Sequence, residues 1–122
     1  MKKTLELPHD HMNEEERQKV LNLMPSDEVI TSVADAMKQL GDPSRLRIFW
    51  LLCHAEECVI DIAAIVGMTS PAVSHHLRLL KTAGLITSRR SGKEMFYKAA
   101  DTLLTQTLHR IIENVGDISC RD

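Results

Sequence analysis

The sequence predicts a mainly α-helical fold with a small β-hairpin, arranged as a winged helix-turn-helix that is dimeric through its N- and C-terminal helices. Two short helical patterns are joined by the tight link "GMTS", which is typical of a helix-turn-helix. The helical periodicity then gives way to two extended runs about a Ser-Gly turn, which indicates a hairpin. The chain has 122 residues, enough for one domain.

The N-terminal quarter of the chain is polar. Residues 1–25 contain prolines on either side of the short helical pattern "EEERQKVLNLM", so we expect a mobile arm that leads into a first helix. A firmer helix follows over residues 28–40, after a Ser-Asp pair that can cap it. The next helix, in "GDPSRLRIFWLLCHA", begins beside Pro43, with Asp42 or Ser44 as its cap.

The predicted helix-turn-helix occupies "CVIDIAAIVG" and "MTSPAVSHHLRLLKTAGL". The first of these helices ends at Gly67, and Thr69 or Ser70 can cap the second. The apolar positions of the second helix face inward: Val73, Leu77 and Leu80. The hairpin follows, with "LITSRR" and "KEMFYKA" as strands about the turn "SG".

A final helix is expected from Asp101 to about Val115. Its apolar stripe is wider than a small domain needs internally: Leu104, Leu108, Ile111, Ile112 and Val115. We assign this stripe, with the 28–40 helix, to a homodimer interface, and the alternative is that both helices simply cover the core. We therefore expect the chain to consist of three segments. Residues 1–25 form the mobile arm and the first helix, residues 26–118 form the winged helix-turn-helix and dimerisation domain, and residues 119–122 form a C-terminal tail.

Composition narrows the class of protein. No run of eighteen apolar residues and no charged start before an apolar stretch is present, so we expect neither a membrane span nor a secretory signal. Three cysteines are an odd number for a disulfide framework, which favours a cytoplasmic protein with reduced thiols. An enzyme is not expected, because the sequence offers neither an activated nucleophile nor a pair of catalytic carboxylates.

The charge distribution points to a polyanion as partner. The net charge is −2, yet residues 78–98 hold six basic residues and only one acidic residue, Glu94. Such a basic segment in an acidic chain is a candidate surface for nucleic acid. The second helix of a winged helix-turn-helix can lie in the major groove, while the hairpin meets the backbone. The predicted DNA-binding residues are Thr69, Ser70, Ser74, His75, Arg78, Arg89, Arg90 and Lys93.

Four stretches together resemble the ArsR/SmtB family of metal-sensing bacterial repressors: "LGDPSRLRIFWLL", "ECVIDIA", "SPAVSHHLRLLKTAGLI" and "RRSGKEMFYKA". The similarity covers residues 28–115 without an obvious gap. It implies a homodimer that sits on double-stranded operator DNA until an inducer ion releases it. Because a two-fold dimer places its recognition helices roughly 34 Å apart, the operator is expected to be an imperfect inverted repeat.

Cys58 and Asp61 are the candidate metal ligands within the domain. They are spaced i and i+3, which places two side chains on one helix face. A thiolate with a carboxylate is a plausible half of a tetrahedral site for zinc, or for a softer relative such as cadmium or lead. The alternatives are that Cys58 is a small buried apolar residue and that Asp61 caps or solvates the helix.

The remaining ligands must come from elsewhere, and His9 and His11 in the polar arm are candidates. The family resemblance implies a site completed by arm residues of the other protomer. A gapless match places His11 and Glu15 on the two arm ligands of the zinc-sensing branch. The sequence departs from the cadmium- and lead-sensing pattern, because position 60 is Ile and the arm has no cysteine, so zinc is favoured as inducer.

A second family site, across the two C-terminal helices, is predicted to be absent. The family pattern requires two histidines at positions that are Leu103 and Asn114 in this chain, and His109 lies off the pattern. Cys53 is expected in the core, and Cys120 lies in the tail without an assigned role. Two alternatives to a metal sensor remain: a repressor of the same fold that responds to thiol oxidation or persulfide, and a regulator that is switched by a protein partner.

Overall fold

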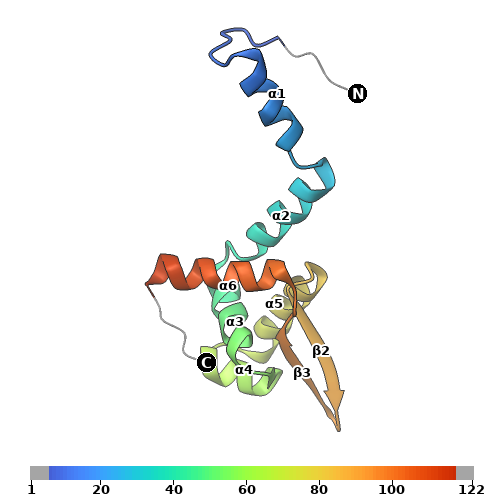
Figure 1. The fold of residues 1–122 in the computed structure, drawn as a ribbon. Helices are drawn as coiled ribbons and strands as arrows, with labels where there is room; N and C mark the ends of the chain where they lie inside the picture. The colour runs from blue at the N-terminus through green and yellow to red at the C-terminus, as the bar shows by residue number, and fades with distance from the viewer. Residues whose placement is uncertain (1–5, 118–122) are drawn as a thin grey trace. The chain divides into compact units, whose positions relative to one another are not determined.

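The computed structural model describes residues 6–117 (Figure 1). These residues form six helices and three strands. The helices are α1 (Glu14–Leu23), α2 (Asp27–Gln39), α3 (Pro43–His54), α4 (Val59–Val66), α5 (Ser70–Thr82) and α6 (Leu103–Gly116). The strands are β1 (Glu57–Cys58), β2 (Ile86–Ser91) and β3 (Glu94–Ala99). The chain divides into two compact units within α2, between Thr31 and Ser32.

The first unit contains α1 and the segment before it. Asn13 caps this helix, because its side-chain oxygen accepts a hydrogen bond of 2.8 Å from the backbone N–H of Glu16. Arg17 forms an ion pair with Asp10 across the start of the helix. No residue of α1 is buried, so local capping and pairing, rather than a core, define this helix.

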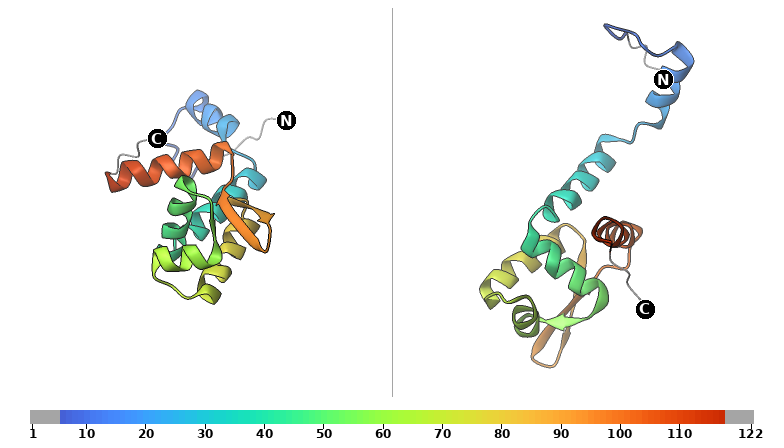
Figure 2. Two further views of the ribbon diagram at one scale, coloured as in Figure 1. Left: turned by 90° about the horizontal axis from the view of Figure 1, so that it is seen from below. Right: turned by 90° about the vertical axis from the view of Figure 1, so that its left-hand side faces the viewer.

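The core of the second unit lies where α3, α4 and α5 meet. Phe49, Ile62 and Leu77 come from these three helices and are no more than 1% exposed. The helix-turn-helix prediction is confirmed, with α4 and α5 packed against each other (Figure 2). Asp42 caps α3 by accepting a 2.9 Å hydrogen bond from the backbone N–H of Arg45.

The link between α4 and α5 is tight because α4 ends in a left-handed turn. Gly67 has φ +68°, a conformation that glycine adopts without steric cost. The backbone N–H of Met68 then donates to the carbonyl of Ala63 over 3.0 Å and closes the helix end. Thr69 caps α5, with its hydroxyl accepting from the backbone N–H of Ala72.

The sheet has three antiparallel strands in the order β1-β3-β2. Two details differ from the sequence prediction. The hairpin turn is Gly92–Lys93, with φ +63° at Gly92, because Ser91 still pairs with Glu94 in the ladder. Cys58 was placed in a helix, but it lies in β1 opposite Phe96 and is the residue before α4. Two residues of strand are too short to leave an alternating pattern in a sequence.

The apolar stripe of α6 divides between two environments. Leu108 is buried, and Leu104 and Ile112 pack against the core, so these positions do cover the core. Ile111 and Val115 remain 45% and 84% exposed. They line an apolar groove of about 410 Å³ whose walls are residues of α2, α3 and α6: Met37, Leu40, Leu46, Leu108, Ile111, Ile112, Val115 and Gly116.

No helix within residues 6–117 is long and apolar enough to cross a bilayer.

Candidate functional site

The outer face of α5 presents polar side chains on a rigid helix. Val73, Leu77 and Leu80 anchor its inner face in the core, as predicted. Ser74, His75 and Arg78 are exposed on the opposite face. Arg78 donates from its guanidinium to Nδ1 of His75 over 2.9 Å, so the two side chains support each other. The outer face of α5 therefore offers hydroxyl, imidazole and guanidinium groups at the surface.

The start of α5 is less available than the sequence suggested. The Thr69 hydroxyl accepts a hydrogen bond as the helix cap, although the residue is exposed. Ser70 is half-buried. Capping and packing therefore leave fewer atoms of Thr69 and Ser70 accessible to a partner than the exposed side chains of Ser74 and His75 offer.

The hairpin carries its basic side chains in two different states. Arg89 forms a two-armed ion pair with Glu56, with its Nε 3.0 Å from both carboxylate oxygens, and its guanidinium lies 5.2 Å from the centre of the Phe96 ring. The pairing lowers the pKa of Glu56 and raises the pKa of Arg89. Arg90 and Lys93 are exposed and make no ion pair within residues 6–117.

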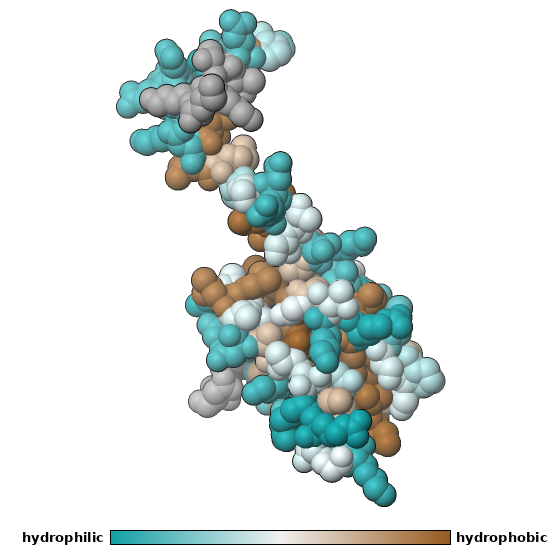
Figure 3. Space-filling view, turned by 90° about the vertical axis from the view of Figure 1, so that its right-hand side faces the viewer, coloured by the Kyte–Doolittle hydropathy of each residue, from teal (hydrophilic) through white to brown (hydrophobic). Residues whose placement is uncertain are grey.

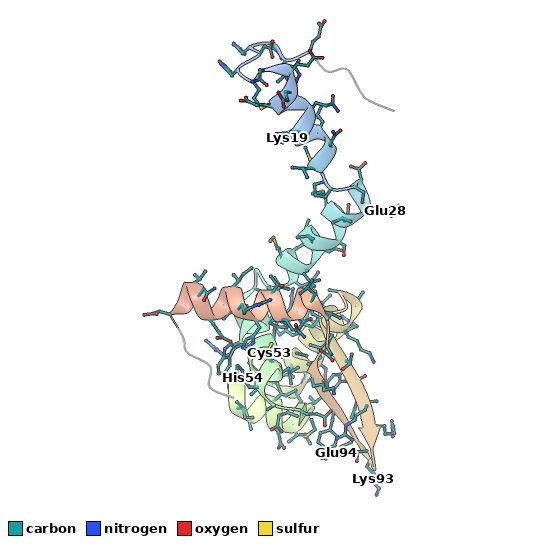
Figure 4. All side chains as sticks on the ribbon, viewed as in Figure 1. Lys19, Glu28, Cys53, His54, Lys93 and Glu94 are labelled. Carbon is teal, nitrogen blue, oxygen red and sulfur yellow. The ribbon has the colours of Figure 1, made fainter. Side chains whose placement is uncertain are left out.

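Hydrophilic side chains gather toward the lower end of the face shown in Figure 3, and Figure 4 places Lys93 and Glu94 at the hairpin tip. The tip of the wing therefore offers the cationic side chain of Lys93, while Arg89, in the middle of the hairpin, is held by Glu56, which precedes β1.

A polar network joins α5 to the helices before it. Arg45 donates from Nε to Nδ1 of His76 over 3.2 Å, and from Nη1 to the side-chain oxygen of Gln39 over 2.7 Å. Because His76 accepts at Nδ1, its imidazole is neutral with the proton on Nε2. Burial lowers the pKa of His76, and the nearby Asp42 carboxylate opposes that shift. Through Arg45, the network links His76 of α5 to α3 and to the end of α2.

Cys58 immediately precedes α4, and Asp61 lies on the first turn of that helix. Cys58 is 6% exposed, stands at the N-cap position and makes no side-chain capping hydrogen bond. Asp61 is exposed and makes no side-chain hydrogen bond or ion pair within residues 6–117. A pocket of about 170 Å³ opens beside Cys58, between the start of α4 and the hairpin residues Lys93 and Glu94. The two predicted ligands thus lie three positions apart at the start of α4, although Cys58 is not inside the helix.

The predicted arm ligands lie in the first unit. The rings of His9 and His11 are stacked, with centroids 5.8 Å apart and planes within 3° of parallel, and both residues are exposed. Glu15 is exposed on the first turn of α1. Within residues 6–117, no three His, Cys, Asp or Glu side chains already stand in the arrangement of a metal site.

The other two cysteines differ in status. Cys53 is half-buried and packs against the core, in keeping with the prediction for it. Cys120 lies outside the described residues.

The fold and the exposed face of α5 define a winged helix-turn-helix DNA-binding protein. Residues 42–88 match the model of the arsR family of bacterial regulatory proteins. The transcriptional repressor SmtB of Mycobacterium tuberculosis is 30% identical over 93 residues, which is 76% of this chain and 69% of that protein. The chain belongs to the ArsR family, so the resemblance seen in the sequence is confirmed.

Two further relatives illustrate the range of the family. A homolog of the cadmium resistance regulatory protein CadC from Staphylococcus aureus is 37% identical over 64% of this chain and 65% of its own length. The solution structure of a homodimeric winged helix-turn-helix DNA-binding domain from Mycobacterium bovis superposes with a TM-score of 0.67. It is 32% identical and covers 77% of this chain and 89% of that domain.

Two long-range side-chain pairings were not predicted from the sequence: Glu56 with Arg89, and Arg45 with His76. The partners of each pair are 33 and 31 residues apart. The sequence carries no local signal for contacts at such separations.

Proposed function

We propose that this protein is a metal-responsive transcriptional repressor that binds operator DNA as a homodimer and leaves it on binding a divalent metal ion. Zinc is the favoured inducer, and cadmium or lead could use the same ligands. The observation that carries the proposal is the position of Cys58. This residue immediately precedes α4 of the helix-turn-helix and also pairs with Phe96 in the wing, so one residue adjoins both DNA-binding elements.

The DNA half of the proposal rests on exposed, supported groups. Ser74, His75 and Arg78 on α5 would contact base edges, where Arg and hydroxyl side chains have suitable donors. Arg90 and Lys93 on the hairpin would contact phosphates. Thr69, Ser70 and Arg89 would add contacts only with the atoms that capping, partial burial and ion pairing, respectively, leave available. The expected operator is an imperfect inverted repeat, read by two copies of α5.

The metal half rests on donor chemistry. A bound zinc ion would supply a fixed positive charge that draws soft and borderline ligands together. Cys58 would bind the ion as thiolate and Asp61 as carboxylate. Within the described residues, the sulfur of Cys58 and the carboxylate oxygens of Asp61 take part in no side-chain hydrogen bond. His9, His11 and Glu15, from the arm of the other protomer, would complete the set.

The coupling would pass through short, packed connections. α4 packs on α5, and β1 joins the residue before α4 to the wing. Glu56, two residues before Cys58, holds Arg89 of the wing. A shift of the start of α4 on metal binding would therefore be transmitted both to α5 and to the hairpin. Allosteric coupling of about 1–3 kcal/mol corresponds to about 5–150-fold in affinity, and a clean switch needs the upper end of that range.

The homodimer is supported by the unfilled apolar groove between α2 and α6. Ile111 and Val115 stand exposed beside it, and the exposed apolar residues of α2 continue the surface within the second unit: Val33 and Met37. Exposed apolar patches of this kind mark interaction sites. The homodimeric Mycobacterium bovis domain gives a precedent for a second copy as the occupant.

Fluorescence anisotropy on the promoter upstream of the protein's own gene tests the proposal. Wild type and Cys58→Ser would be titrated onto DNA in reducing buffer, with and without zinc, cadmium or lead. We expect a metal to release wild type only, with unchanged metal-free DNA affinity in the variant. The matched control is Cys53→Ser, which leaves the proposed ligands intact. Release of Cys58→Ser by zinc would reject this ligand. Release by peroxide or sulfide instead of metal would favour the thiol-based alternative.

A further inference from the structure

A single arginine of α3 joins the helix that would read the operator to the end of α2. The side chain of His76, in the middle of α5, is only 13% exposed, and its Nδ1 accepts a hydrogen bond of 3.2 Å from Nε of Arg45. The same guanidinium donates from Nη1 to the backbone carbonyl of Gln39 over 3.2 Å and to its side-chain oxygen over 2.7 Å. Arg45 therefore holds α2, α3 and α5 together through one planar group.

This network borders the apolar groove that we assign to the dimer interface. Leu40 follows Gln39 in the chain, Leu46 follows Arg45, and both leucines line the groove. The surface on which a second copy would dock is thus connected to α5 through Arg45. Because a two-fold dimer must fit two copies of α5 into successive turns of the major groove, the way α5 is held on α2 and α3 bears directly on operator binding.

A proton on Nδ1 of His76 is incompatible with the hydrogen bond from Arg45. A guanidinium has only donors, so His76 can accept from it only while Nδ1 keeps its lone pair. The carboxylate of Asp42, which caps α3, has its Oδ2 4.0 Å from the same nitrogen. A protonated Nδ1 would be repelled by Arg45 and would donate to Asp42. The imidazole therefore has a different partner in each of its two charge states.

We infer, on the basis of the operator binding proposed above, that Arg45 and His76 are positioning residues for α5, and that acid weakens operator binding by exchanging Arg45 for Asp42 as the partner of His76. Loss of the Arg45 hydrogen bond would leave α5 less firmly tied to the dimer groove. None of the proposed metal ligands takes part in this exchange.

The charges around His76 keep the hydrogen bond intact near neutral pH. Burial lowers the pKa of His76 below its ordinary 6.5, Asp42 opposes this shift, and Arg45 and His75 add to it. The ring of His75 lies 5.7 Å from that of His76, centroid to centroid. Among the described residues, α4 and β2 also pack on α5 but contribute no charged group that acts on His76.

The expected size of the effect follows from the fraction of protein in the competent state. If only the form with neutral His76 docks on the operator, the apparent affinity is reduced by the fraction of protein in that form. Below the pKa of His76, this fraction falls by about tenfold per pH unit in each protomer. A homodimer that needs both copies of α5 would show the product of the two reductions.

Anisotropy titrations of wild type and His76→Gln on operator DNA, from about pH 7.5 to about pH 5, test the inference. The glutamine amide oxygen accepts from Arg45 at any pH in this range, so we expect similar affinities near neutral pH. The ratio of wild-type to variant affinity should then fall with pH by up to about tenfold per unit for each protomer. All other titratable groups are common to both proteins, so the ratio isolates His76. Circular dichroism restricts the comparison to conditions in which both proteins are folded.

The matched control is His109→Gln, since this histidine lies on α6, where its Nε2 is 2.9 Å from that of His54. Its affinity relative to wild type should not change with pH. A constant ratio of wild type to His76→Gln, with normal operator binding, would overturn this inference alone. A failure of wild type to bind the operator near neutral pH would reject the proposed function and this inference together.

Nitrogen NMR of the unmodified, DNA-free protein gives a second readout that involves no variant. Near neutral pH, Nδ1 of His76 should resonate as an unprotonated ring nitrogen and Nε2 as a protonated one. Nδ1 should gain its proton over the same pH range in which operator affinity is lost. A protonated Nδ1 near neutral pH would overturn the inference, because Arg45 could not then donate to it.

Discussion

The hairpin arginines give the sharpest prediction for DNA binding, because two neighbours differ in their partners. Arg90 is exposed and makes no ion pair within residues 6–117, whereas Arg89 is held by Glu56 and lies over Phe96. A cation that neutralises a phosphate releases condensed counterions, and a cation already neutralised by a carboxylate releases fewer. Arg90→Ala should therefore change the salt dependence of DNA binding more than Arg89→Ala does.

The magnitude follows from the number of charges removed. A homodimer loses two phosphate contacts when Arg90 becomes Ala, and each contact contributes about 0.9 to the slope of log Kobs against log salt, so the slope should fall by about 1.8. Over a fourfold rise in salt, the variant should then lose about tenfold less affinity than wild type. Arg89→Ala should lower the slope by less than half as much, and Glu56→Gln should raise it by releasing Arg89.

The assay is a series of anisotropy titrations on operator DNA at several salt concentrations, with Arg110→Ala on α6 as the matched control for loss of an exposed arginine. The control should leave the slope unchanged. Equal slopes for wild type and Arg90→Ala, together with a large fall for Arg89→Ala, would refute the reasoning. The ion pair with Glu56 would then open on DNA, and Arg89 would be the principal phosphate contact.

Three further predictions concern the scaffold that presents α5. Leu77→Ala, at a site only 1% exposed, should lower the free energy of unfolding by about 2–5 kcal/mol in urea titrations. Gly67→Ala should cost about 1–2 kcal/mol through its φ of +68° alone, since an added Cβ meets no atom within 4 Å; a neutral result would contradict this. Burial lowers the pKa of His76 from its ordinary 6.5, so the unfolded chain binds the extra proton and stability should fall as pH drops below 6.5. His76→Gln should flatten that part of the stability profile, and an unchanged profile would exclude His76 as the cause.

Much of the fold followed from local signals in the sequence. The helix-turn-helix was predicted because Gly67 ends one helix and Thr69 caps the next, and both features depend on residues close together in the chain. The hairpin was predicted from its turn residues, with an error of one residue because Ser91 continues the ladder. β1 was missed, since two residues pair with β3 through a contact some forty positions away.

The site could be predicted only in part. Spacing predicted one helix face for Cys58 and Asp61; the structure places Asp61 on the first turn of α4, whereas the short strand moves Cys58 to the position before the helix. The ion pair between Glu56 and Arg89 and the cluster of His54 with His109 depend on tertiary packing. His109 lay off the known family pattern, and only the arrangement of α3 beside α6 brings it to His54.

The central claim is that metal binding at Cys58 and operator binding oppose each other. Isothermal titration of zinc into wild type, with and without saturating operator DNA, tests it most directly. Linkage requires that DNA weaken zinc binding by the same factor by which zinc weakens DNA binding. The account predicts equal factors near the upper end of about 5–150-fold for wild type, and no effect of DNA on any zinc that Cys58→Ser still binds. Equal zinc affinity of wild type with and without DNA would contradict it.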